Sequence, residues 1–166
     1  MLRVVFDTNV YGLLIIENDN EKIRDSITKD KDFLVYGAKI IRNELRDTPK
    51  NIRVGRFNAR SLLLSLYDEI TRGRQVEDHG LVSDLAIDFY NEYVKIGGKR
   101  SWKEMHNDFM IVAYACSNNL DVLISEDAKT MLSKRALESY KNIAVKANLR
   151  VPNFWTYKDL REKYEF

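Results

Sequence analysis

The chain has 166 residues, 45% of them hydrophobic, so it can bury a core yet is short enough for a single domain spanning 1–166. Charged residues make up 31% but leave a net charge of only +2, so any basic surface must come from local clustering. One cysteine, Cys116, excludes an internal disulfide and, lying in an apolar run, is expected to be a core thiol. The apolar runs are too short to span a bilayer, so we expect a cytoplasmic protein without a membrane segment.

The first half of the chain alternates strand and helix patterns. The apolar residues at 3–6 are β-branched or aromatic and stop at a polar break, which is typical of a buried strand. The segment AKIIRNELRD has helical spacing and stops before Thr48-Pro49. We therefore predict strands at 3–6 and 33–36 and helices at 10–17, 38–47 and 57–71.

The second half continues the alternation. The run at 121–124 predicts a third buried strand, and the one at 152–155 a weaker fourth. Helical patterns cover 81–96, 103–117, 128–140 and 157–163. Strands that alternate with helices predict an α/β fold, with a parallel sheet of about four to five strands and helices on both faces.

Two acidic residues follow predicted strands. Asp7 comes directly after the first strand in VVFDTNV, and Asp127 follows the third strand in LISEDAKT. In open α/β sheets ligands bind at the carboxyl ends of the strands, so both residues are candidates for a site. Capping of the next helix is the alternative for each, because Asp is a good N-cap residue.

Two further acids lie on apolar helix faces. Glu44 follows Ile40 and Ile41 at spacings of four and three, and Asp108 precedes the apolar positions three, four and seven residues later. A buried carboxylate costs several kcal/mol unless something pairs with it. Pairing with an arginine, or a place at a helix end, is the alternative. Asp47, one turn after Glu44, is the second candidate on that helix.

Four converging carboxylates would repel one another unless a cation lay between them. Oxygen ligands suit Mg²⁺ or Mn²⁺, whereas Zn²⁺ favours His or Cys. Here His79, His106 and Cys116 have unhelpful spacings for zinc. We therefore predict a Mg²⁺ or Mn²⁺ site.

With VVFDTNV, IIRNEL, NDFMIVAYA and LISEDAKT in this order, the chain resembles the PIN-domain family of metal-dependent ribonucleases over nearly its whole length. The resemblance implies endonucleolytic hydrolysis of single-stranded RNA by a metal-activated water. By motif, the catalytic and metal-binding acids correspond to Asp7, Glu44, Asp108 and Asp127. The supporting polar residues would be Thr8, Asn9 and Ser125, with Glu126 either a supporter or the alternative fourth acid.

Basic stretches provide candidate RNA contacts outside the acidic site. One stretch follows the second predicted helix and the other precedes Asp108, where an aromatic residue could stack on a base. The candidates are Arg46, Lys50, Arg53, Arg56, Arg100 and Trp102. Ordinary solvated surface is the alternative for each stretch. The family resemblance also implies single-stranded or structured RNA as a partner, together with an antitoxin-like protein or a second copy of the chain in a homodimer.

Two other functions compete with this interpretation. A haloacid-dehalogenase-like phosphatase also begins with a strand that ends in Asp, but it needs a second Asp two residues later, where this chain has Asn9. A catalytically inactive RNA- or protein-binding module on the same fold is the alternative from another class. The presence of all four acids favours the nuclease.

Overall fold

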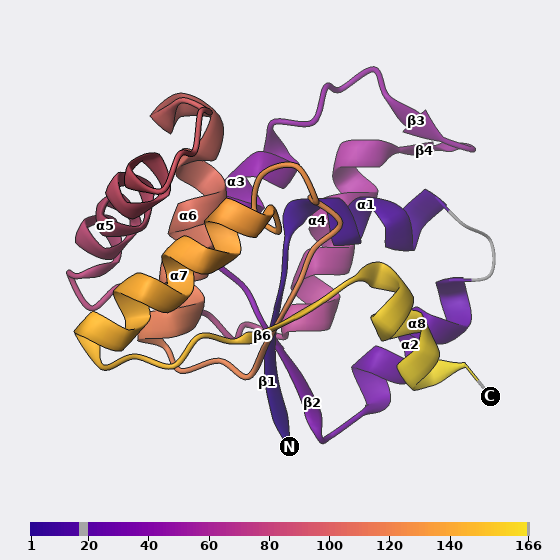
Figure 1. Ribbon diagram of the computed structural model, residues 1–166. Coiled ribbons are helices and arrows are strands. Elements are labelled where there is room, and N and C mark those ends of the chain that lie inside the picture. The colour runs from indigo at the N-terminus through magenta and orange to yellow at the C-terminus, as the bar shows by residue number, and fades with distance from the viewer. Residues whose placement is uncertain (17–19, 166) are drawn as a thin grey trace.

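The computed structural model describes residues 1–16 and 20–165 (Figure 1). Its main sheet has four parallel strands, which confirms the predicted α/β class. In spatial order they are β2 (Phe33–Tyr36), β1 (Leu2–Phe6), β5 (Val122–Ile124) and β6 (Asn153–Trp155). The predicted strand positions are therefore correct to within one residue.

The two central strands are buried because their sequences are apolar on both faces, as parallel sheets require. Val4, Val5 and Phe6 of β1, like all three residues of β5, are at most 2% exposed. The chain passes from β1 to β2 on one side and later returns to β5 on the other. The strand order thus reverses between β1 and β5, where ligands bind in open α/β sheets.

Helices cover both faces of the sheet (Figure 1), as predicted. On one side lie α1 (Thr8–Ile16), α2 (Asn20–Lys29), α4 (Ala59–Thr71) and α8 (Tyr157–Tyr164). On the other lie α6 (Trp102–Ser117) and α7 (Lys134–Ala147), with α5 (Val82–Lys95) packed against both. Their apolar faces form one core, in which Cys116 is 2% exposed, as expected of a core thiol. Within the described residues, no helix is both long and apolar enough to cross a membrane.

One helix and two short strands were not predicted. The helix α2 has only Ile23 and Ile27 as apolar residues, too few for a clear periodic signal. The antiparallel pair β3 (Arg53–Val54) and β4 (Phe57–Asn58) turns at Gly55, whose φ of +60° suits the first position of a tight hairpin turn. This hairpin lies in Figure 1 at the end of the molecule to which β1 runs.

Two predicted helices were misplaced, and a third extends beyond the described residues. The helix expected from residue 57 begins at Ala59, because Asn58 accepts a hydrogen bond from the Ser61 amide as its N-cap. The helix predicted at 128–140 is α7, which begins at Lys134 after the N-cap Ser133. The helix predicted at 10–17 begins earlier, at Thr8, and residue 17 lies outside the described residues. The helix α3 (Lys39–Arg46) lies within its predicted range.

Candidate active site

Asp7 lies at the junction of the two central strands. Phe6 is paired with Ile124, and the Asp7 amide donates to the Ile124 carbonyl oxygen at 2.9 Å. Ser125, which follows Ile124, donates a hydrogen bond from its hydroxyl to Asp7 Oδ2 at 2.7 Å. The strand register therefore brings the Asp7 and Ser125 side chains together.

Asp7 is only 5% exposed. Burial raises its pKa, the hydrogen bonds from Ser125 and the Thr8 amide oppose the rise, and the charge of Asp127 adds to it. An N-cap side chain normally accepts from the second or third helical amide. Asp7 Oδ1 accepts instead from Thr8, the first residue of α1, at 2.8 Å. Capping therefore explains its position poorly.

Glu44 lies on α3 and is half-buried. Its Oε2 accepts a hydrogen bond from Thr8 Oγ1 at 2.9 Å, whereas Oε1 is buried without a hydrogen-bond partner in the part of the chain that the structure describes. Burial raises the Glu44 pKa, the hydrogen bond from Thr8 opposes the rise, and the negative charge of Asp7 adds to it. Asp47, the second candidate on this helix, is the exposed residue that follows α3.

Asp108 lies in the second turn of α6, with Ile111, Val112 and Ala115 buried beside it as predicted. Burial raises the Asp108 pKa to about 7. A hydrogen bond from the Thr130 hydroxyl to Oδ2 opposes this rise. The charges of the other three acids increase the Asp108 pKa further; these acids are Asp7, Asp127 and Glu44.

Asp127 is half-buried in the loop after β5. Its amide donates to Ser125 Oγ at 3.1 Å, and its Oδ1 accepts from the Thr130 amide at 3.1 Å. Thr130 therefore contacts two acids, Asp108 through its hydroxyl and Asp127 through its backbone. Sequence reasoning missed Thr130, although its place three residues after an Asp is a common side-chain-to-backbone turn pattern.

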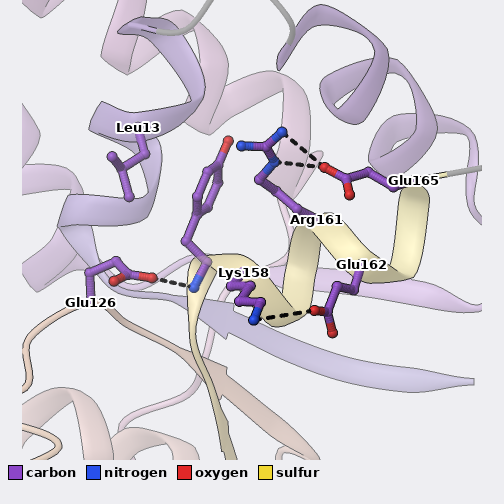
Figure 2. Close-up of a pocket in the computed structure, with 7 residues that line it drawn as sticks. Leu13, Glu126, Lys158, Arg161, Glu162 and Glu165 are labelled. Carbon is purple, nitrogen blue, oxygen red and sulfur yellow. Dashed lines mark hydrogen bonds and ion pairs between the residues drawn. The ribbon is translucent and has the colours of Figure 1, made fainter.

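Glu126 points away from the other acids. Its side chain is exposed and accepts a hydrogen bond from the amide of Tyr157, the first residue of α8. Figure 2 shows Glu126 turned toward the start of that helix, where a negative charge is favourable. Asn9 connects the two regions, because its Oδ1 accepts from the Glu126 amide and its Nδ2 donates to Asp7 Oδ2. Asp127 rather than Glu126 thus lies with the acids.

The structure brings the four predicted acids together at one edge of the sheet, close enough for their charges to interact. Within residues 1–16 and 20–165, however, no three carboxylate, His or Cys side chains are already arranged to hold a metal ion. Of the two histidines, His106 contacts Asn107 and Trp102, and His79 is near Glu77.

The predicted RNA contacts fall in two places. Four of them lie between the end of α3 and the β3–β4 hairpin and are exposed, namely Arg46, Lys50, Arg53 and Arg56. Arg100 instead forms an ion pair with Glu104 at 3.2 Å. Trp102 packs edge-on against Tyr90 and His106, with ring centroids 5.3 and 5.0 Å away. These two side chains therefore already have partners within the protein.

Comparisons with protein families and with curated proteins found no match.

Proposed function

We propose that this protein is a divalent-metal-dependent endoribonuclease that hydrolyses phosphodiester bonds of single-stranded RNA, as its resemblance to PIN-domain nucleases implies. One observation carries the proposal: four acids from separate segments meet at the carboxyl edge of β1 and β5, where burial and the charges of neighbouring acids raise the pKa values of Asp7, Glu44 and Asp108. Mutual repulsion among carboxylates destabilises the protein, and a cation bound between them would offset that cost.

The side chains at this edge fit a hard divalent cation. The donors are carboxylate oxygens, which Mg²⁺ and Mn²⁺ prefer, and Glu44 Oε1 is buried without a hydrogen-bond partner among the described residues. Asp7, Glu44, Asp108 and Asp127 would hold the ion. When bound, it would supply Lewis acidity, lowering the pKa of an attacking water and offsetting charge on the phosphate.

The protein's own residues orient these acids. Ser125 and the Thr8 amide hold both oxygens of Asp7, and the Thr8 hydroxyl holds Glu44. Thr130 fixes Asp108 and Asp127 relative to each other. Water is the proposed nucleophile. The buried thiol of Cys116 is unsuited to that role, because burial raises its pKa to about 12 and keeps it neutral.

A cleavage assay tests this function. Purified protein is incubated with a panel of end-labelled single-stranded RNAs and Mg²⁺, Mn²⁺ or a chelator. We expect metal-dependent cleavage that Asp108→Asn abolishes while circular dichroism shows the variant folded. Asp88→Asn, which changes an exposed acid on α5, is the matched control and should cleave normally. Chelator-resistant cleavage, or full activity of Asp108→Asn, would exclude the proposed site. Folded protein that binds RNA without cleaving it in any metal would favour the inactive binding module.

A further inference from the structure

A pocket of about 490 Å³ lies between the end of α5 and the start of α7. Tyr93 and Ile96 form its wall on the α5 side. The other side carries basic and acidic side chains from the loop before α7 and from α7 itself, namely Lys129, Lys134, Arg135 and Glu138. None of the four acids lines the pocket, but the loop after β5 that carries Asp127 also carries Lys129.

The three cations of this pocket are not neutralised by the protein. Lys134 and Glu138 have the i,i+4 spacing that pairs Arg100 with Glu104 and Lys158 with Glu162, yet they form no ion pair. Across residues 1–16 and 20–165, none of the three cations forms an ion pair or hydrogen bond with another side chain or with the backbone. Their positive charge is therefore available to an anion.

Two of these cations lie at the unfavourable end of α7. The first turn of this helix is Lys134-Arg135-Ala136-Leu137, and these four residues include no acidic residue. The start of a helix carries partial positive charge, so cations there are repelled and an anion is favoured. A bound anion would relieve this local conflict between sequence and structure.

Arg135 also lies close to the turn after α5. Its guanidinium packs against the turn after α5, so close that a Cβ built on Gly97 would lie 3.4 Å from Arg135 Cζ. Gly97 has φ +100°, a conformation that other residues rarely adopt. The Arg135 guanidinium therefore lies beside the α5 end of the pocket.

The loop that carries Lys129 connects the pocket to the acids. The next residue, Thr130, donates hydrogen bonds to both Asp108 and Asp127. We propose that this pocket, defined by Lys129, Lys134 and Arg135, binds a backbone phosphate of the RNA strand next to the one that is cleaved. This proposal rests on the proposed function, since it assigns the path of the same substrate. Lys and Arg contacts to phosphates position a nucleic acid without reading its sequence.

RNA binding by the full-length protein tests the pocket. Anisotropy of a fluorescent single-stranded RNA 12-mer is measured at several salt concentrations, with chelator present to prevent cleavage. The test variant is Lys134→Gln with Arg135→Gln. The matched control is Lys141→Gln with Lys146→Gln, which removes the same charge from exposed positions farther along α7. We expect the salt slope of log K to fall by about 0.7 for each lost phosphate contact in the test variant and to stay unchanged in the control.

The outcomes separate the pocket from the nuclease function. A slope equal to that of the control variant overturns the pocket, even if the unmodified protein still cleaves RNA with metal. Absence of metal-dependent cleavage by the unmodified protein would refute the proposed function. A weaker salt dependence of binding in the Lys134→Gln with Arg135→Gln variant alone would still support RNA binding in the pocket. If the unmodified protein binds no RNA, the pocket proposal is wrong. Equal losses in both variants would show general charge attraction and would also overturn it.

Discussion

Ser125 Oγ donates a buried hydrogen bond to Asp7 Oδ2 at 2.7 Å, although the two residues are 118 positions apart in the chain. The bond exists because β1 and β5 are neighbouring parallel strands that end in register at Phe6 and Ile124. It holds a carboxylate in place where three other acids approach.

Asp7→Asn should remove most of the protein's response to metal. A ligand at about 100 times its dissociation constant adds ~2.7 kcal/mol of stability, which is a rise of very roughly 5–11 °C in Tm for a domain near this size. We expect such a rise with Mn²⁺ in the unmodified protein and little of it in Asp7→Asn. Without metal the variant should be at least as stable, because Asn removes a buried charge that Asp127 repels. Thermal denaturation with and without Mn²⁺ measures both effects, and equal shifts in the two proteins would show that Asp7 is not a ligand.

Stability of the metal-free protein should fall as pH rises from about 5 to 7.5. The Asp108 pKa is about 7 in the folded protein and 3.8 in its ordinary state, so the folded protein binds the proton more tightly. Its stabilising contribution is therefore complete below pH 3.8 and is lost as pH rises through 7. A pKa raised from 3.8 to about 7 corresponds to at most roughly 4 kcal/mol of stability.

The difference between the unmodified protein and Asp108→Asn isolates this effect. Chemical denaturation with chelator present, at several pH values, gives the unfolding free energy of each. We expect the stability of the variant relative to the unmodified protein to increase with pH, because Asn cannot ionise. A pH-independent difference would show that Asp108 titrates normally.

Thr130→Val should weaken metal binding and shift it to higher pH. The substitution removes the hydroxyl that donates to Asp108 but leaves the backbone amide that donates to Asp127. Without that donor the Asp108 pKa rises further, so protons compete better with the cation. Loss of a partner that orients a metal ligand typically costs about 10–100-fold in affinity. Mn²⁺ titrations at pH 6 and 8 should show the larger loss at pH 6, and Thr130→Ser should restore binding. Equal binding by the Val and Ser variants would contradict a positioning role.

Arg53→Ala with Arg56→Ala should weaken RNA binding and flatten its salt dependence. Both residues lie on the exposed hairpin at the end of the molecule to which β1 runs (Figure 1). Each lost contact with a phosphate of a single strand makes the slope of log K against log salt concentration about 0.7 less steep. Loss of both contacts should therefore make it about 1.4 less steep. Anisotropy titrations against salt measure this, with Lys141→Ala and Lys146→Ala as the charge-matched control. An unchanged slope would identify the hairpin as ordinary solvated surface.

Local sequence patterns determined the order and type of most elements. Short apolar runs such as 3–6 and 121–124 must be buried on both faces, so they predicted central parallel strands. The positions of Asp7 and Asp127 after such strands, and of Glu44 and Asp108 on apolar helix faces, followed from the same short-range periodicity. The helix α2 escaped because two isoleucines are too weak a signal.

The tertiary structure decided which neighbouring residues face the same space. Glu126 and Asp127 are adjacent in sequence, yet one side chain binds the α8 amide and the other lies with the acids. The contacts that join Ser125 to Asp7 and Thr130 to Asp108 depend on strand register and helix packing across more than twenty residues of chain. Periodicity reports only whether a side chain faces the core, whereas these pairings arise when distant segments pack together. The sequence alone therefore identified the four acids, and only the packed structure determined what holds each of them.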